Sequence, residues 1–278
     1  MNIIIINTGS SSIKFQMLAM PDQKVICSGL VDRIGLGSSN LVYETQNTKV
    51  QEVLDIDNHE AGLKKISELL VDPKIGVIKD TSEITAVGHR VVHGERFSDP
   101  MKITEKVKEK IKDLFLLAPL HNPAHLQGIN VAEEIFSDAE HIAVFDTAFF
   151  QTIPEVAHKY AIPNEIADKY HIRQYGFHGT SHKFVSERAI DFLGVKESKI
   201  ITIHLGNGCS ITAVKDGKSI DHSMGFSPAN GLIMGTRSGD IDHSVVFYLN
   251  DLGFSVKEIS DLLQKKSGML GLTGYSDL

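Results

Sequence analysis

The sequence predicts an α/β protein made of two related domains, and three observations support this. Strand-like and helix-like segments alternate between residues 84 and 146, as expected for an α/β layer. A strand, a small polar turn and a second strand open the chain, and the same order recurs near residue 200. The 278 residues suffice for two hydrophobic cores. We therefore expect domains at residues 1–148 and 149–278.

The opening hairpin is the first predicted element. Residues 3–6 are isoleucines, apolar on both faces, which predicts a central strand covered on each side. Residues 13–18 alternate between apolar and polar and predict the second strand. The turn from Asn7 to Ser12 offers backbone N–H groups and hydroxyls to an anion, and Lys14 adds a positive charge. An ordinary hairpin turn explains the same residues equally well, and a Walker A loop is absent.

Up to residue 146 the pattern predicts the rest of an antiparallel meander, followed by helices that alternate with strands. Helices are expected where apolar residues recur at helical spacing, over 59–71, 104–117 and 122–136. Asp57-Asn58 offers a cap to the first, and Pro123 occupies the favoured first turn of the last. Strands are expected over 24–31, 41–46, 49–56, 84–92 and 141–145.

The second half begins with residues 147–173, which Pro154 and Pro163 punctuate and which we interpret as a domain connection. A helix is expected over 179–193 with Thr180 or Ser181 as its cap. Residues 223–240 form a long glycine-rich loop, and loops of this kind are often functional. The remaining expectations are strands over 200–205, 211–214 and 218–222, helices over 240–251 and 255–265, and a glycine-rich stretch over 267–274.

The second hairpin repeats the order of the first. Placing Ser210-Ile211 on Ser12-Ile13 aligns both flanking strands, and a third strand follows in each case. This indicates an internal duplication in which each domain presents a polar hairpin to a shared cleft, although two unrelated hairpins would also look alike. The second domain is the shorter one, and we expect it to lack its closing elements.

The composition excludes several classes of protein. The formal charge of −7 argues against a nucleic-acid-binding protein, which usually carries a basic excess. Cys27 and Cys209 are too few for a disulfide framework or a zinc site, so we expect a reducing, cytoplasmic setting. No apolar run approaches the roughly 18 residues of a membrane span, and the isoleucine run is too short for a signal peptide. We expect no nucleic-acid or membrane partner.

Three charged residues are candidates for a site. Arg90, on a predicted strand, and Arg237, in the glycine-rich loop, suit bidentate recognition of a carboxylate or phosphate. For each of them, an ion-paired surface arginine is the alternative. Asp146 directly follows a strand, which is where α/β sheets place their chemistry, but a carboxylate there can also cap a helix.

Histidines recur in pairs with the spacing H-x-x-x-H. On a helix this spacing can hold a metal, but the H-E-x-x-H pattern is absent, and one pair lies on a predicted strand. The loop residues His121 and His178 are better candidates for direct contact with a substrate. Ser-His-Asp catalysis is a further alternative, although no G-x-S-x-G elbow is present. The pairs are His89/His93, His121/His125 and His178/His182.

Six motifs in one order are specific enough to identify a family. They are Asn7-Thr-Gly-Ser-Ser-Ser-Ile-Lys14, Gly88-His-Arg-Val-Val-His-Gly94, Phe145-Asp-Thr-Ala-Phe149, Tyr175-Gly-Phe-His-Gly-Thr-Ser-His182, His204-Leu-Gly-Asn-Gly208 and Met234-Gly-Thr-Arg-Ser-Gly-Asp240. Over its whole length the chain thereby resembles the acetate kinases. The resemblance implies two duplicated actin-like (ribonuclease H-like) domains with a central mixed sheet and a nucleotide cleft between them.

The chain departs from the family pattern in two places. Gly94 is followed directly by Glu95, where the family usually has a second glycine, and we expect this to shift the edge of a loop. The family's chains also continue well past Leu278. The resemblance therefore implies that an adenosine-binding glycine loop, a glutamate near the magnesium ion and a closing helix are missing, and that the second domain is incomplete.

The resemblance implies direct, reversible transfer of the γ-phosphoryl group of ATP to acetate, giving acetyl phosphate and ADP. In that case Arg90 and Arg237 hold the acetate carboxylate beside the transferring group, His178 hydrogen-bonds the transition state and His121 assists. Catalytic Asp146, together with Asn7, would position Mg²⁺, or Mn²⁺ in its place. The residues implied for the phosphates are Ser10, Ser12, Lys14, His204, Gly206, Asn207 and Gly208.

The resemblance also implies a small pocket for the methyl group of acetate, formed by Val92, Leu120, Phe177 and Pro228. Val92 favours acetate over propionate modestly, because one methylene is worth roughly 1–3 kcal/mol. The implied partners are acetate, ATP and a second copy of the chain in a homodimer. The alternatives are a propionate or butyrate kinase, an ATP-hydrolysing protein of the actin or chaperone type without an acyl acceptor, and an inactive fragment that keeps only the fold.

Overall fold

The computed structural model describes residues 1–119 and 121–277, which form two compact units. The first unit comprises Met1–Gly94 and Asp99–Phe145, and the second comprises Glu95–Ser98 and the chain from Asp146 onwards. The domain division expected after residue 148 stays a prediction, since compactness alone does not define a domain. No helix formed by the described residues is long and apolar enough to cross a membrane.

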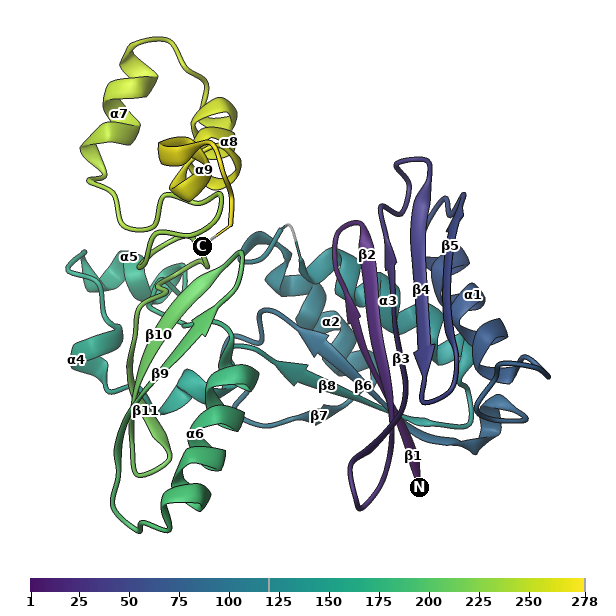
Figure 1. Ribbon diagram of the computed structural model, residues 1–278. Coiled ribbons are helices and arrows are strands. Elements are labelled where there is room, and N and C mark those ends of the chain that lie inside the picture. Colours follow the sequence, from purple (N-terminus) through teal and green to yellow (C-terminus); the bar gives the residue numbers. More distant parts are fainter. Residues whose placement is uncertain (120, 278) are drawn as a thin grey trace. The chain divides into compact units, whose positions relative to one another are not determined.

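The first unit is built on an eight-stranded mixed sheet in the order β5-β4-β3-β2-β1-β6-β8-β7 (Figure 1). Strands β1 to β5 form the expected antiparallel meander, whereas β1, β6 and β8 run parallel. Strand β7 was not predicted, because two residues carry no pattern. The bounds are Asn2–Thr8 (β1), Ser12–Ala19 (β2), Lys24–Asp32 (β3), Ser39–Thr45 (β4), Lys49–Leu54 (β5), Ile84–Val91 (β6), Met101–Lys102 (β7) and Glu140–Phe145 (β8).

The parallel strands end at one edge of this sheet. Ile6 of β1 pairs with His89 of β6, and Arg90 of β6 pairs with Val144 of β8. The carboxyl ends of the three strands are therefore level with one another. This is the edge at which open α/β sheets bind their ligands.

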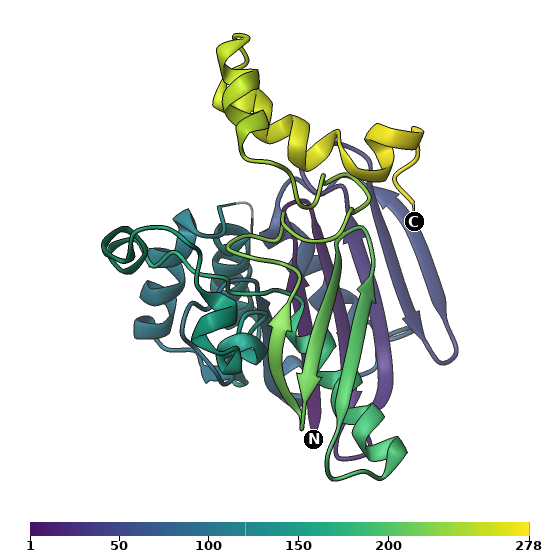
Figure 2. The same cartoon turned by 90° about the vertical axis from the view of Figure 1, so that its left-hand side faces the viewer.

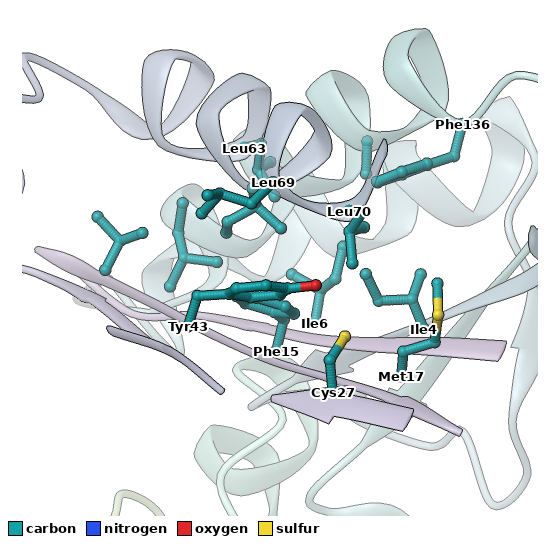
Figure 3. Packing of buried hydrophobic residues seen from close by; sticks show 14 of the residues in the cluster. Ile4, Ile6, Phe15, Met17, Cys27, Tyr43, Leu63, Leu69, Leu70 and Phe136 are labelled. Atoms are coloured by element: carbon teal, nitrogen blue, oxygen red, sulfur yellow. The ribbon is translucent and has the colours of Figure 1, made fainter. Parts of the chain in front are cut away.

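Helices α1 (His59–Val71) and α3 (Asn122–Ile135) close the core over one face of the sheet (Figure 3). Asn58 caps α1 as expected, because its side chain accepts the N–H of Ala61 at 2.9 Å. The single helix expected over 104–117 was wrong in its last turn. Helix α2 spans Glu105–Asp113 and tightens into a 3₁₀ helix at Leu114–Leu116, as helix ends often do. A further 3₁₀ helix spans Thr81–Glu83.

The expectation that β1 is covered on both faces was also wrong. Ile4 and Ile6 are 0% and 1% exposed and belong to the core cluster with α1 and α3, but Ile5 is 43% exposed. Successive side chains of a strand point to opposite faces, so Ile5 lies on the face that these helices do not cover.

The second unit contains a three-stranded antiparallel sheet in the order β11-β10-β9 (Figure 2). The strands are Lys199–Leu205 (β9), Cys209–Lys215 (β10) and Lys218–His222 (β11). This order matches β3-β2-β1 of the first unit, as the repeated hairpin predicted. The turns differ in length, because residues 9–12 separate the paired Thr8 and Ile13, whereas only residues 206–208 separate Leu205 and Cys209.

The helices of the second unit correct three expectations. The stretch 147–173 is more than a connection, since Pro154 and Pro163 each precede a short helix. Helix α7 begins later than residue 240, because Asp240 instead bonds Gly231 through both its N–H and its carboxylate. The stretch 267–274 contains a helix. The bounds are Ala148–Thr152 (3₁₀), Glu155–His158 (α4), Asn164–Lys169 (α5), Gly179–Leu193 (α6), Ser244–Asp251 (α7), Val256–Lys265 (α8) and Gly268–Thr273 (α9).

Helix α8 carries the capping box that the sequence predicted. The hydroxyl of Ser255 accepts the N–H of Glu258, and the carboxylate of Glu258 accepts the N–H of Ser255. This reciprocal pair satisfies two N–H groups that a helix start leaves without an intrahelical partner.

The alternation along β1 gives a matched pair of variants. Ile4→Ala should lower the free energy of unfolding by about 2–5 kcal/mol, because it leaves a cavity under α1 and α3. Ile5→Ala removes the same atoms from a side chain that is 43% exposed and should cost much less. Urea unfolding followed by circular dichroism measures both. Equal losses in the two variants would contradict the one-sided core.

Candidate active site

In the first unit, the turn of the opening hairpin is held by backbone contacts. The N–H of Gly9 donates to the carbonyl oxygen of Ser12 at 2.7 Å, and Nε2 of the buried His59 donates to the carbonyl oxygen of Gly9 at 2.7 Å. Lys14 and Ser10 are exposed. Asn7 pairs with Lys14 across the hairpin. The buried side chain of His59 therefore holds the backbone of the turn, while Ser10 and Lys14 are exposed to solvent. A phosphate-binding role for the turn stays a prediction.

Hydrogen bonds from the first turn of α3 hold the segment that directly follows β6. The N–H of Val92 donates to Nδ1 of His125 at 3.2 Å. Asn122 accepts the N–H of His93 at 3.1 Å and donates to the carbonyl oxygen of His93 at 3.0 Å. This local contact brings together the carboxyl end of β6, where Arg90 and Val92 lie, and the start of α3, where His121 lies. Leu120 lies outside the described residues.

In the second unit, the start of α6 carries His178 in a left-handed backbone conformation, with φ of 63°. The N–H of the next residue, Gly179, donates to the carbonyl oxygen of Asp146 at 2.9 Å, and the backbone there leaves no room for a Cβ. Thr180 and Ser181 are therefore not the cap, and this expectation was wrong. His178 is the N-cap residue, and its side chain makes no capping bond to the helix.

His222 supports the residue before His178. Its Nε2 accepts the N–H of Phe177 at 3.1 Å, so in the neutral ring the proton lies on Nδ1, which is 2.7 Å from Oγ1 of Thr212. Burial, and then the nearby His182 and His178, lower the pKa of His222 to about 2. His222 therefore acts as a neutral structural residue. The sequence did not predict this role, because an isolated histidine at the end of a strand matches no functional motif.

Arg237 lies beside the turn of the second hairpin. A Cβ placed on Gly208 would lie 3.2 Å from Nη1 of Arg237 and 3.3 Å from Cε1 of His178, so the turn approaches both side chains closely and a larger residue would have to displace them slightly. Nη1 of Arg237 donates to the carbonyl oxygen of Pro228 at 2.8 Å and lies 3.6 Å from the sulfur of Met234. Burial lowers the pKa of Arg237, and no carboxylate of the described chain is paired with it.

The arrangement around Arg237 suits an anion. A shielded guanidinium without an opposite charge is unfavourable, and a carboxylate or phosphate can relieve this by binding both of its N–H groups. The turn is itself held in place, because the N–H of Gly235 donates to the carbonyl oxygen of Asn207 at 3.1 Å. The thiol of Cys209 also lies 3.1 Å from the carbonyl oxygen of Gly206.

His204 steadies the ring of His178. The two imidazoles stack with their centroids 4.1 Å apart, and Nδ1 of His204 lies 2.9 Å from the hydroxyl of Ser181. Within the second unit, four of the candidate positions therefore converge from separate segments of the chain: His178, His204, Gly208 and Arg237. Pro228 joins them through its carbonyl group, and Asp146 is tied to the start of α6.

The histidine pairs do not form a metal centre. Across residues 1–119 and 121–277, no group of three or more His, Cys, Asp or Glu side chains could hold a metal ion. Nε2 of His89 instead lies 2.9 Å from Nδ1 of His141. Burial and this neighbour lower the pKa of His89 to about 3.

Comparison with known proteins identifies relatives of this chain. The model of the acetokinase family matches residues 2–278. An acetate kinase of Flavobacterium johnsoniae is 65% identical over 280 residues, which cover 100% of this chain and 71% of that protein. The solved structure of Porphyromonas gingivalis acetate kinase has a TM-score of 0.92 at 45% identity. A propionate kinase from Francisella tularensis has a TM-score of 0.94, also at 45% identity. Both structural matches cover 99% of this chain and 71% of the other.

The buried histidine behind Phe177 predicts a pH dependence of stability. The folded pKa of His222, about 2, lies below the ordinary value of 6.5, so its contribution is complete above pH 6.5 and is lost as the pH falls towards 2. At about pH 5.5 the wild type should have lost about 1.4 kcal/mol through this residue. His222→Gln keeps an acceptor for the N–H of Phe177 but does not titrate. Urea unfolding at pH 5.5 and at a pH above 6.5 measures the loss of unfolding free energy. This loss should be smaller in the variant, and equal losses would refute the assignment.

Proposed function

The chain belongs to the acetokinase family, and from that premise we propose that it transfers the γ-phosphoryl group of ATP reversibly to acetate. The products are acetyl phosphate and ADP. The observation that carries the proposal is the shielded Arg237, which has no carboxylate partner in the described chain and lies beside His178 and the Gly208 turn. Such a site is built to receive an anion, and every substrate and product of this reaction is one.

The reaction requires charge neutralisation more than covalent chemistry. A carboxylate and a phosphoryl group repel each other, and a positive side chain offsets that repulsion while it holds the two in line. Arg237 has this role in the second unit, and Arg90 has it in the first. His178 donates a hydrogen bond to the phosphoryl oxygens as their charge changes, and His121 assists it. A carboxylate oxygen of acetate attacks the γ-phosphorus atom directly, and ADP leaves.

The two polar hairpins are the proposed phosphate-binding elements. In the first unit the assigned residues are Ser10, Ser12 and Lys14, whose side chains stand on the turn that His59 fixes. In the second unit they are His204, Gly206, Asn207 and Gly208, on the turn that contacts Arg237. In both turns, backbone N–H groups and small side chains allow a close approach of an anion.

Asn7 and Asp146 are the proposed residues for Mg²⁺, with Mn²⁺ as a substitute. Asp146 is 2% exposed, and its carboxylate and the amide oxygen of Asn7 are the hard donors that Mg²⁺ prefers. Few protein ligands suffice, because Mg²⁺ usually retains water and binds the phosphates of its nucleotide. When bound, the ion neutralises charge on the phosphates of ATP. The residues present therefore fit the ion.

The proposed acceptor is acetate, and the residues that we assign to its methyl group are Val92 of the first unit and Phe177 and Pro228 of the second. Val92 and Phe177 are 5% and 1% exposed, so both contribute apolar surface to the interior of their units. Propionate is the second candidate, favoured by the likeness to the Francisella propionate kinase. We further propose a homodimer in the cytoplasm, and sedimentation at several concentrations would test the dimer.

The proposed reaction can be tested by trapping the product. The protein is incubated with MgATP and acetate, acyl phosphate is captured with hydroxylamine, and ADP is measured in parallel with and without acetate. Arg237→Ala should lower kcat/KM by about 10²–10³, because one transition-state contact is lost. Arg237→Lys keeps the charge without the planar fork and should recover only part of the rate. Exposed Arg188, replaced by alanine, is the matched control.

Each alternative has its own outcome in this assay. ADP formed at the same rate without acetate, with no trapped product, would indicate an ATP-hydrolysing protein of the actin or chaperone type. Normal turnover in Arg237→Ala would remove Arg237 from the reaction. Product that depends on acetate and disappears in this variant would support the kinase.

The size of the methyl pocket is tested by Val92→Ala. The added space should raise the rate with propionate relative to acetate by about 10-fold, because one methylene is worth roughly 1–3 kcal/mol. The same hydroxylamine assay with acetate, propionate and butyrate measures the ratio. An unchanged ratio would place the acyl chain elsewhere.

A further inference from the structure

A row of buried side chains leads from strand β9 to His178. Oγ1 of Thr202 lies 2.7 Å from Nδ1 of His182, Nε2 of His182 lies 2.7 Å from Oγ of Ser210, and this oxygen lies 2.9 Å from Nδ1 of His178. Thr202, His182 and Ser210 are 2%, 1% and 0% exposed. None of these three residues is assigned to the binding of a substrate, so the row has another role.

The secondary structure explains how one hydroxyl reaches two imidazoles. His178 and His182 are four residues apart at the start of α6, and this spacing places them on the same face of the helix. Strand β10 pairs with β9 so that Ser210 lies opposite His204. Helix α6 packs against β9, and the Ser210 hydroxyl therefore lies between the two rings.

Proton counting leaves two directions for this row. A serine hydroxyl has one proton, and a neutral imidazole has one N–H. Burial, and then His204, lower the pKa of His182 to about 4, so this ring is neutral near pH 7. If Ser210 donates its proton to one of the two rings, either Thr202 donates to His182, His182 to Ser210 and Ser210 to His178, or all three bonds run the other way. A Ser210 that accepted from both rings would leave its own buried proton without an acceptor, which is unfavourable. The first direction leaves the proton of His178 on Nε2, and the second places it on Nδ1.

The surroundings of His178 select the first direction. A Cβ built on Gly208 would lie 3.4 Å from Nε2 of His178 and 3.2 Å from Nη1 of Arg237. Both nitrogen atoms are therefore close to the turn that we propose as an anion site. A carboxylate or phosphate oxygen only accepts hydrogen bonds in its ionised form. A neutral His178 can therefore contribute there only with its proton on Nε2, and its Nδ1 must then accept from Ser210.

We propose that Thr202, His182 and Ser210 form a directed hydrogen-bond chain that holds the proton of a neutral His178 ring on Nε2, ready to donate to the transferring phosphoryl group. The choice of direction and the kinetic part of this proposal rest on the proposed function. Ser210, His182 and Thr202 are positioning residues, since they act through His178 and do not contact the substrate. The stacked His204 fixes the plane of the ring, and the chain fixes its proton.

The tautomer can be observed directly. Nitrogen-15 NMR of histidine-labelled protein near pH 7.5, without substrate, distinguishes Nε2–H, Nδ1–H and doubly protonated rings, and His178→Gln assigns the signal. The wild type should show His178 with its proton on Nε2 only. Ser210→Ala should give a mixture of the two neutral tautomers, because the donor to Nδ1 is gone. The matched control is Ser219→Ala, since Ser219 is also 0% exposed but its hydroxyl has no partner among the described residues.

Kinetics provide the second measurement. Loss of one neutral hydrogen bond predicts that kcat falls about five- to tenfold in Ser210→Ala, while KM for acetate and ATP changes less than about twofold. Thr202→Val removes the first donor in the chain and should shift the tautomer in the same direction, which keeps the test valid if Ser210→Ala does not fold. His182→Gln retains an N–H donor for Ser210 and should stay closer to the wild type than His182→Leu.

Several results would overturn the proposal. They are a wild-type His178 that carries its proton on Nδ1, one that is doubly protonated, and a tautomer that neither Ser210→Ala nor Thr202→Val changes. Because the NMR measurement uses no substrate, it remains decisive if the protein does not phosphorylate acetate. Failure of the proposed function and failure of the hydrogen-bond chain are thus distinguishable.

Discussion

The shielded positive charge of Arg237 is the constraint on which the second unit depends. A guanidinium removed from water without an opposite charge has to be held by neutral oxygen atoms, and the carbonyl group of Pro228 provides one. The loop over residues 223–240 has neither helix nor strand and is held by hydrogen bonds of its own. Gly231, in its middle, bonds Asp240 at its end, and Gly235 bonds Asn207 of the second hairpin. These contacts hold the loop that carries the arginine.

In the first unit, the corresponding constraint is the shared edge of three parallel strands. The register between β1, β6 and β8 places Asn7 and Arg90 at the ends of adjacent strands. Helix α3 then fixes the loop that follows β6, through Asn122 and His125. A sheet edge of this kind presents several side chains in one direction without any strain in the strands. The core under α1 and α3 packs against one face of the same strands.

Much of this could be predicted from the sequence, because the signals were local. Helix α1 agrees with its predicted bounds, since the Asn58 cap and the apolar spacing lie within one segment. The motifs singled out His178, Gly208 and Arg237, which lie close to one another in the second unit. Failures occurred where a distant partner decides the local structure. The start of α6 was misassigned because the carbonyl oxygen of Asp146, far away in sequence, accepts the N–H of Gly179, and the helix already begins at Gly179, ahead of Thr180 and Ser181.

One rung of the three-stranded sheet shows why the supporting residues escaped sequence analysis. The apolar residues of β9 that attract notice, Ile201 and Ile203, are 63% and 56% exposed, whereas Thr202 between them is buried. Thr202 pairs with Thr212 across β9 and β10, and Thr212 pairs with His222 across β10 and β11.

This single rung reaches both residues that precede α6. Thr202 begins the row of hydrogen bonds that ends at the ring of His178, and Nε2 of His222 accepts the backbone N–H of Phe177. An apolar rung would fill the same space, but it could fix neither the proton of an imidazole nor a left-handed backbone. The polar residues of this rung therefore hold the backbone of Phe177 and, through Ser210, contact the ring of His178.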